Sequence, residues 1–457
     1  MRKNLFYTLL LLPLVCISCL DNNSETEATT YNEALVTAMT FAKNDSFPGL
    51  AEAKFTIITS TDTGRIYNDD SLRFGTCIDS VIPSLSFNHT PAYTVFYTGA
   101  DSTADTVIYT GADTINFSVQ PVHLFVMASD KETGKYYEIY VNVHTVDPDL
   151  YQWECLNEEV FRADGAETKA MMLGDKLLLF AGNGFQTQLY TSANGASWSA
   201  GQVVNSLPAN CAVRKILQVE NTLYYPAGDK LYTSTDGLNW QSSNISGFSL
   251  LNMLFLFNDS IWGIAQRPDQ QLQLCNMARG GNMALTGEVL PSNFPVSDYA
   301  ALPFTSPSNR KRAMIVGGFD LQGNSLNTRW NMEYLKGKGY SLANFSIEQP
   351  SFASLTGASI VLYNDEFHMF GSVSEDNALS TDNQLISIDE GLHWILPDTT
   401  KNQLPESYRS RQKASVFVDS DSHYIYIIGG QNRTESFTDV YRGRLNKLTF
   451  AKWRTVR

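Results

Sequence analysis

A short segment that ends in tryptophan recurs along the second two thirds of the chain. It reads LYTSANGASW at residues 189–198, LYTSTDGLNW at 231–240 and LISIDEGLHW at 385–394. Two further tryptophans, Trp153 and Trp453, bracket the series and are 300 residues apart, which is six steps of 50. A repeat near 50 residues with a strand, a tight turn and a tryptophan is typical of a β-propeller. The sequence therefore predicts a propeller of six blades, with seven as the alternative.

Each expected blade contains an apolar strand that ends in small residues, and we interpret it as the second strand of its blade. These strands are expected at residues 176–183, 222–229, 260–266, 313–320, 366–372 and 424–431. Small residues suit this position because glycine lets backbones bend and approach one another near the central channel. Units three and four lack the tryptophan, and we expect their outer strands at residues 285–290 and 340–345.

The recurrent segment combines a serine, an aspartate or asparagine, a glycine and the tryptophan. In such a turn the polar side chains satisfy backbone groups, glycine takes the strained position, and the tryptophan packs beneath. We interpret these residues as structural rather than ligand-binding. They are Ser192, Asn194, Trp198, Ser234, Asp236, Trp240, Ser387, Asp389 and Trp394.

The chain before the propeller divides into three parts. Residues 1–18 carry a basic start and a short apolar stretch, as in a signal peptide, and residues 19–31 form a polar, acidic tether. Residues 32–147 begin with a weakly helical stretch at 31–42 and continue as short alternating strands. These strands are expected at 53–60, 94–99, 106–111, 114–119, 123–130 and 136–146. The pattern predicts an antiparallel β-sandwich, joined to a propeller at 150–457 by Asp147-Pro148-Asp149.

Ser18-Cys19 after the apolar stretch resembles a bacterial lipoprotein lipobox, with Cys19 as the lipidated residue. Cys16 stands where the lipobox usually has leucine, and an ordinary secretory signal is the alternative. The acidic residues after Cys19 resemble signals that send Bacteroidetes lipoproteins to the outer face of the outer membrane. The resemblance implies an outer-membrane lipoprotein exposed at the surface, with the periplasmic face as the alternative.

The net charge of −14 and the pI of about 4.9 limit the partners. Nucleic acid and anionic membrane surfaces both require basic patches, so the only membrane contact expected is the lipid anchor. Four cysteines remain in the mature chain without metal-like spacing, and their disulfide status stays open: Cys77, Cys155, Cys211 and Cys275.

Several motifs resemble those of known families. The glycine pairs Gly317-Gly318 and Gly429-Gly430 resemble kelch repeats, and the serine-aspartate turns resemble the Asp-box of sialidase-type propellers. The hairpin at residues 123–143 resembles the end of immunoglobulin-like modules in Bacteroidetes surface lipoproteins. Lipobox, sandwich and propeller, in that order, resemble an uncharacterised Bacteroidetes lipoprotein family of the DUF6242 type. That family brings no activity with it.

No catalytic or metal-binding constellation is recognisable. A sialidase requires Arg-Ile-Pro near the start of the propeller, whereas Arg65-Ile66-Tyr67 lies in the first domain. A copper oxidase requires histidine ligands, and no pair among the six histidines has ligand spacing. We therefore expect no cofactor and no metal, and we favour a protein without enzymatic activity.

Loops that follow the second strands offer the best candidates for ligand contact, because propellers bind through the loops of one face. Six residues are expected to contact a ligand: Arg267, Asp269, Phe319, Asp320, Asn432 and Arg433. The leading interpretation is a lipid-anchored envelope protein that binds a glycan or a protein partner. The alternatives are a carbohydrate hydrolase or lyase on the propeller scaffold, and a structural envelope protein.

Overall fold

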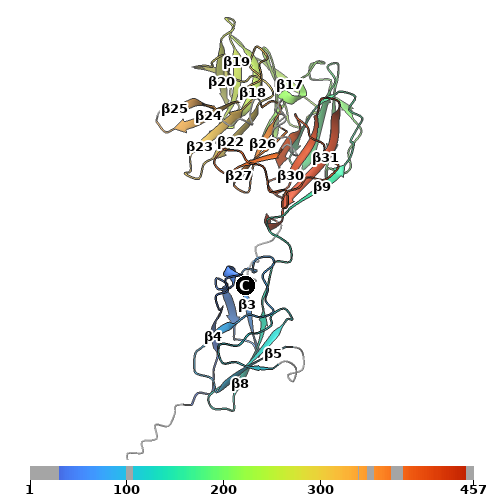
Figure 1. Ribbon diagram of the computed structural model, residues 1–457. Helices are drawn as coiled ribbons and strands as arrows, with labels where there is room; N and C mark the ends of the chain where they lie inside the picture. Colours follow the sequence, from blue (N-terminus) through green and yellow to red (C-terminus); the bar gives the residue numbers. More distant parts are fainter. Residues whose placement is uncertain (1–29, 99–105, 338, 347–354, 372–383, 449–457) are drawn as a thin grey trace, which may run out of the picture. The chain divides into compact units, whose positions relative to one another are not determined.

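The computed structural model describes residues 30–98, 106–337, 339–346, 355–371 and 384–448 (Figure 1). The chain divides into two compact units, Met1–Thr145 and Val146–Arg457. The predicted all-β fold class is confirmed. Helix in the described segments is limited to three short 3-10 turns, η1 (Pro48–Leu50), η2 (Val213–Lys215) and η3 (Asn446–Leu448). Among these residues, no helix has the length and apolar character needed to traverse a bilayer.

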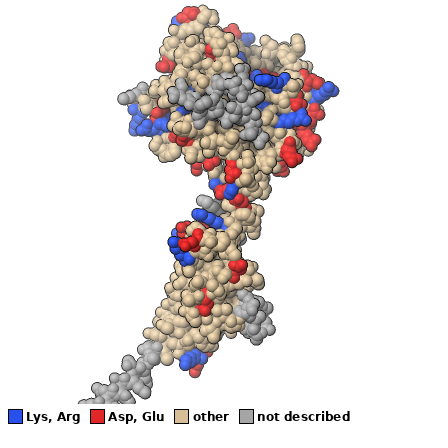
Figure 2. Space-filling model, in the orientation of Figure 1, with Lys and Arg blue, Asp and Glu red and all other residues tan. Residues whose placement is uncertain are grey.

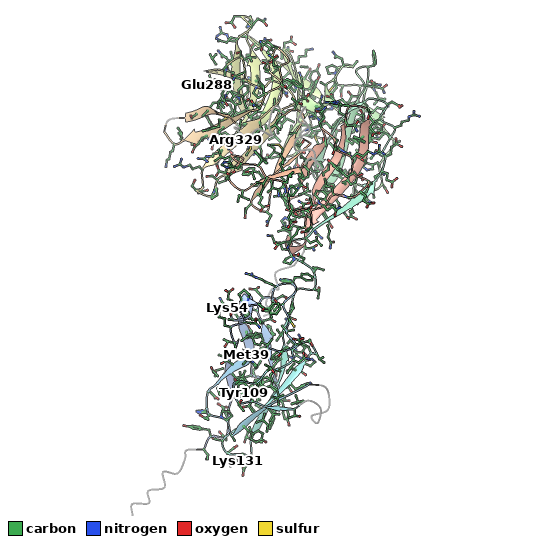
Figure 3. All side chains as sticks on the ribbon, viewed as in Figure 1. Met39, Lys54, Tyr109, Lys131, Glu288 and Arg329 are labelled. Atoms are coloured by element: carbon green, nitrogen blue, oxygen red, sulfur yellow. The ribbon has the colours of Figure 1, made fainter. Side chains whose placement is uncertain are left out.

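The N-terminal unit contains two sheets around one hydrophobic core. The larger sheet has six strands, in the order β2 (Phe55–Ile58), β3 (Thr63–Asn68), β8 (Gly134–Tyr140), β7 (Val122–Met127), β5 (Tyr93–Thr98) and β6 (Val107–Ile108). The smaller sheet pairs β1 (Val36–Phe41) with β4 (Pro83–Phe87). Buried side chains of both sheets meet in the core, among them Met39, which Figure 3 labels, and Leu124. All strand neighbours are antiparallel except β3 and β8.

The helix expected at residues 31–42 is wrong, because the structure places strand β1 there. Val36, Met39 and Phe41 are buried, so the spacing between buried residues is three and then two. A register shift between Val36 and Ala38 produces this spacing, since a bulge breaks strict alternation. The resulting pattern imitates helical periodicity, although Val36, Thr37 and Thr40 favour a strand. The strand expected at 114–119 is likewise reduced to an isolated bridge between Val81 and Ile115.

In its described residues, the second unit is a β-propeller of six sheets, and all six predicted second strands occupy the second position. Blade one contains β10 (Glu167–Leu173), β11 (Lys176–Gly182), β12 (Thr187–Ser192) and β13 (Gln202–Val203). Blade two contains β14 (Leu217–Val219), β15 (Thr222–Ala227), β16 (Lys230–Ser234) and β17 (Gln241–Asn244). Blade three contains β18 (Ser249–Phe257), β19 (Ser260–Gln266), β20 (Leu272–Ala278) and β21 (Ala284–Val289). Blade four contains β22 (Ala300–Thr305), β23 (Lys311–Val316), β24 (Thr328–Leu335) and β25 (Gly339–Ser346).

The last two blades depart from this simple order. Blade five has three strands in the described part of the chain, β26 (Ser359–Tyr363), β27 (Glu366–Phe370) and β28 (Gln384–Ser387). Blade six contains β29 (Ser415–Val418), β30 (Ile425–Gln431) and β31 (Ser436–Leu445), and its outer strand is β9 (Tyr151–Asn157). The first strand of the unit thus closes the ring against the last blade, with Trp153 opposite Gly443. Trp453, expected to end the sixth repeat, lies outside the described residues.

The three tryptophan turns share one hydrogen-bond pattern. In each turn the serine Oγ accepts a bond from the glycine N–H, at 2.8 Å, 2.9 Å and 2.8 Å. The Asp or Asn Oδ1 accepts two further backbone N–H groups, and the tryptophan Nε1 donates to the glycine carbonyl. These contacts satisfy backbone groups that a tight turn would otherwise leave unpaired.

The turns of blades two and five also join neighbouring blades. Trp240 of blade two packs edge-on against Phe180 of blade one, with 6.3 Å between ring centroids. Trp394 lies in a buried cluster with Phe304 and Met314 of blade four as well as Phe367 of its own blade. The tryptophans therefore stabilise the contact with the preceding blade.

Candidate functional site

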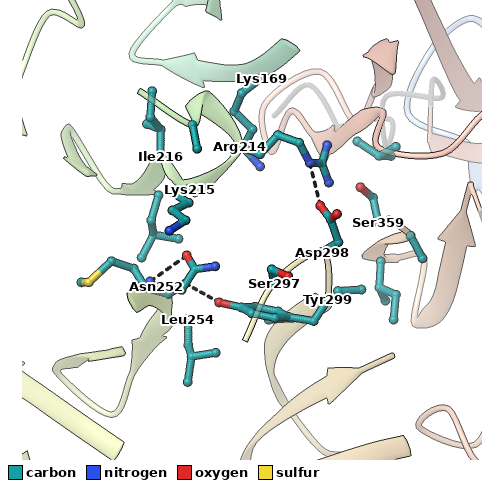
Figure 4. Close-up of a pocket in the computed structure, with 18 of the residues that line it drawn as sticks. Lys169, Arg214, Lys215, Ile216, Asn252, Leu254, Ser297, Asp298, Tyr299 and Ser359 are labelled. Atoms are coloured by element: carbon teal, nitrogen blue, oxygen red, sulfur yellow. Dashed lines mark hydrogen bonds and ion pairs between the residues drawn. The ribbon is translucent and has the colours of Figure 1, made fainter. Parts of the chain in front are cut away.

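A cavity of about 330 Å³ lies at the centre of the propeller (Figure 4). Every blade contributes to its wall, mostly near the first residue of the innermost strand. The lining residues are 167 and 169 from blade one, 212 and 214–217 from blade two and its approach, 252–254 from blade three, 297–301 from blade four, 358–360 from blade five, and 414 and 416 from blade six. A cavity of this size falls within the range of small-ligand sites in proteins.

Glycines at the ends of the second strands allow neighbouring backbone segments to pass close by on their way to the cavity. Gly318 and Gly430 adopt φ angles of +90° and +100°, which other residues rarely adopt. A Cβ atom on Gly318 would lie 2.5 Å from the Ser297 carbonyl oxygen, and one on Gly430 would lie 2.8 Å from that of Gln412. The segments that lead into β22 and β29 therefore cross these glycines in close contact. The predicted role of the glycine pairs, a close approach of backbones near the channel, is consistent with this geometry.

An ion-pair network fixes the segments that reach the cavity from three blades. Asp298 accepts a hydrogen bond from Arg214 Nε at 3.1 Å, and its other oxygen lies 3.0 Å from Lys413 Nζ. Arg214 also donates to the Lys413 carbonyl at 2.5 Å. Burial opposes ionisation of Asp298, but the two cations outweigh it and hold the pKa of this carboxyl below its ordinary value. Asp298 is therefore ionised and engaged by the protein itself.

Lys169 and Lys215 project into the same cavity (Figure 4). Burial lowers the pKa of the Lys169 ammonium to about 8, and repulsion from Arg214 adds to the effect. Burial also lowers the pKa of Lys215. Neither ammonium has a hydrogen-bond partner or a carboxylate within 4.0 Å among the described residues. Glu167 attracts both at longer range. The cavity therefore holds two partly buried ammonium groups that have no direct counter-ion among the described residues.

The positive cavity contrasts with the outer surface of the protein. On the face that Figure 2 shows, acidic and basic side chains are interspersed over the propeller. The whole chain carries a net charge of −14. The excess of cations in the cavity is therefore a local property rather than a consequence of composition.

The six loop residues predicted to contact a ligand follow β19, β23 and β30. In an antiparallel blade the end of the second strand and the start of the innermost strand lie at the same end of the sheet. The loops therefore lie at the cavity end of their blades. Backbone bonds confirm this for two of them, between Phe319 and Ser297 and between Gln431 and Gln412.

Several of these loop side chains already have partners. Asp320 accepts bonds from the N–H groups of Gln322 and Asn324, and Asn432 does the same for Thr434 and Glu435. Their side chains therefore stabilise turns. Arg267 pairs with Asp269 at 3.3 Å, and both are substantially exposed. Arg433 is exposed. Ligand contact by the six residues stays a prediction.

Sequence reasoning did not identify the residues that line the cavity. Lys169, Arg214, Lys215, Asn252 and Asp298 lie in or just before innermost strands, which carry no tryptophan and no turn motif. The available signal was a pair of charged residues at the start of a strand that continues with apolar residues, as in ETKAMML of β10. A buried charge in a strand often marks a functional position.

Histidines and cysteines form no cluster at the cavity. Within the described segments, no group of three or more His, Cys, Asp or Glu side chains could hold a metal ion. His368 is fully buried and lies 3.2 Å from Gln384 Nε2 and 3.5 Å from the Tyr151 hydroxyl. Cys77, Cys155, Cys211 and Cys275 are free thiols, of which the last two are buried.

Two family models match the chain. The DUF6242 beta propeller domain matches residues 147–453, and the DUF6242 N-terminal domain, of unknown function, matches residues 23–141. The chain belongs to the DUF6242 family. The boundary between these matches agrees with the division of this DUF6242 protein into two units at Thr145. Cys19 lies outside both matches and outside the described residues.

Two solved structures are similar to part of this DUF6242 protein. One is entitled "Structure of YjhT", with 10% identity, a TM-score of 0.43, and coverage of 62% of this chain and 96% of that one. The other is a protein of unknown function from Dyadobacter fermentans DSM 18053, with 9% identity, a TM-score of 0.40, and coverage of 64% and 99%. No curated protein matches the sequence.

Proposed function

We propose that this DUF6242 protein is a lipid-anchored envelope protein that binds a glycan at the central cavity of its propeller without converting it. The observation that carries the proposal is the cavity itself, which receives residues from all six blades. A concave site of about 330 Å³ suits a unit the size of a sugar ring, whereas stable protein partners usually bury larger and flatter surfaces. The exposed Arg267 and Arg433 loops would contact the parts of the glycan that extend beyond the cavity.

The remaining parts of the proposal concern family and location. The chain is a Bacteroidetes-type outer-membrane lipoprotein, and its N-terminal unit is an immunoglobulin-like spacer. The antiparallel β7–β8 hairpin supports this description of the spacer, whereas the parallel β3–β8 pair departs from a purely antiparallel sandwich. The propeller is of kelch and Asp-box type. The glycine contacts and the three serine turns described above support that description.

Cys19→Ala is expected to abolish lipidation and release the protein from membranes, because the acyl chains would be its only membrane attachment. Membrane fractionation with labelled palmitate measures this, and Cys77→Ala serves as the matched control. Continued palmitate incorporation in the Cys19 variant would contradict the lipobox assignment.

The binding function is tested with the soluble chain that begins at Leu20, on a glycan array and in a parallel pull-down from envelope extract. We expect retention of a defined set of glycans. The variant Ser297→Trp, which fills the cavity from a lining position, should lose that retention while keeping its melting temperature. Capture of a protein by both forms, or release of shortened glycan by the wild type, would contradict the proposal.

A further inference from the structure

We propose that the central cavity takes a carboxylate-bearing sugar unit, whose anionic group lies between the ammonium groups of Lys169 and Lys215. This inference rests on the proposed binding function and adds the chemical class of the ligand to it.

The charged residues of the cavity wall favour an anionic ligand. Lys169, Arg214 and Lys215 line the cavity, against the two carboxylates Glu167 and Asp298. Asp298 is shared by Arg214 and by Lys413, which approaches it from the segment before β29. After this pairing, Lys169 and Lys215 remain as cations that have no carboxylate within 4.0 Å among the described residues, and Glu167 attracts both at longer range. The wall is therefore complementary to an anion.

In the free protein, the two ammonium groups lose part of their hydration without gaining a direct partner among the described residues. Placing two ammonium groups in one partly enclosed cavity desolvates both, and neither gains a direct bond from the described residues in return. Charged groups that are desolvated without a partner are characteristic of sites that a ligand completes. An anion between the two lysines would supply the missing counter-charge and charge-assisted hydrogen bonds.

The volume of the cavity and its uncharged lining residues favour a sugar over a bare inorganic anion. A cavity of about 330 Å³ leaves space beyond one small anion. Asn252 faces this space with an amide that is fixed by the Met253 N–H at 2.9 Å and the Val296 carbonyl at 3.2 Å. The Tyr299 hydroxyl donates to the Met253 carbonyl at 2.9 Å, so its ring is held along the wall (Figure 4). A fixed amide and an aromatic ring suit the hydroxyls and the apolar face of a sugar.

The test uses the chain from Leu20 and calorimetric titration with sodium glucuronate, glucose, and inorganic sulfate and phosphate as probes. Glucuronate should bind at least tenfold more tightly than glucose, and more tightly than either inorganic ion. Lys169→Met and Lys215→Met should each reduce glucuronate affinity at least tenfold and abolish the preference over glucose. Lys176→Met removes an exposed lysine of the same blade and should leave both affinities unchanged.

A pH series gives a second readout that does not depend on folding of a variant. The charged residues that line the cavity with Lys169 are Glu167 on its own strand, Arg214 and Lys215 before β14, and Asp298 before β22. Since the pKa of Lys169 lies near 8, this ammonium loses its proton as the pH rises from 7 to 9. Asp298 stays ionised over this range, because its two cationic partners hold its pKa below the ordinary value. Glucuronate affinity should therefore fall severalfold between pH 7 and pH 9 in the wild type, and fall less in Lys169→Met.

The outcomes separate this inference from the proposed function. Equal binding of glucuronate and glucose, or full preference in both lysine variants, would overturn the inference while array binding still supported a glycan-binding function. Equal affinity for sulfate or phosphate would overturn the sugar assignment. Binding of glucuronate through the two lysines with no glycan retained on the array would support the cavity chemistry and contradict the proposed function.

Discussion

Trp394→Ala is expected to lower the free energy of unfolding of the propeller by about 3–5 kcal/mol, the range for a large aromatic removed from a core. Trp394 is 4% exposed and lies among apolar side chains of blades four and five. Its Nε1 donates to the Gly391 carbonyl at 3.1 Å, so the substitution also leaves a turn carbonyl without its partner. The loss should be measured by denaturant unfolding followed by circular dichroism.

The matched control is Trp198→Ala, in the equivalent turn of blade one. Trp198 makes the same bond to a glycine carbonyl, at 2.8 Å, but its ring is only partly buried. We expect a clearly smaller loss for this variant, because less apolar surface returns to water. Equal losses for both tryptophans would indicate that burial between blades does not determine the role of Trp394.

Arg411→Ala is expected to destabilise the propeller by about 3–5 kcal/mol, because it leaves a buried carboxylate without its counter-ion. The Arg411 side chain is fully buried and binds both oxygens of Asp439, with 2.9 Å for the Nη2 contact. The guanidinium also lies over the rings of Phe437 and Tyr408, at 4.1 Å and 4.5 Å from their centroids. Chemical unfolding measures the loss.

Two further variants isolate the cause. The double variant Arg411→Met with Asp439→Leu should recover much of the lost stability, since replacing both charges removes the unpaired one. Arg409→Ala removes the neighbouring exposed pair with Glu435 and should cost less than about 1 kcal/mol. A double variant as unstable as Arg411→Ala would show that packing of the guanidinium, rather than the charge, stabilises the segment before β29.

The second strands could be predicted because local chemistry marks them. Each combines an apolar run, which is buried on both faces in the ring, with a small residue at its end. Gly318 and Gly430 lie so close to a neighbouring backbone segment that a side chain would clash with it. A glycine at each of these positions therefore indicates a tertiary contact that can be predicted from the sequence. The serine turns are similarly local, because their hydrogen bonds join residues two to four apart.

Features that depend on contacts between residues far apart in the sequence could not be predicted from local motifs. Strand β9 belongs to blade six through β31, so Glu154 lies opposite Arg442, 288 residues away. Strand β1 contains a bulge that hides its alternation, and its partner β4 is more than 40 residues away. The residues of the cavity could not be predicted for the same reason. Lys169, Lys215 and Asp298 come from three blades, and only closure of the ring brings their charges together.

For the loop residues, the sequence allows more than one role. Asp320 and Asn432 were candidates for ligand contact because they are polar and follow second strands. Their oxygens accept backbone N–H groups of their own turns, a role that aspartate and asparagine commonly fill, and ligand contact by these residues stays a prediction. A polar loop residue can therefore stabilise its own turn, and the sequence alone does not distinguish this role from ligand contact.

The central claim is that the cavity of the propeller is where a ligand binds, and a crystal structure of the chain from Leu20 with its best array glycan tests it most directly. The account predicts electron density for a sugar unit between Lys169, Lys215 and Asn252, with the ion pairs of Asp298 retained. A glycan bound on the outer strands, or an empty cavity beside an occupied site elsewhere on the protein, would contradict it.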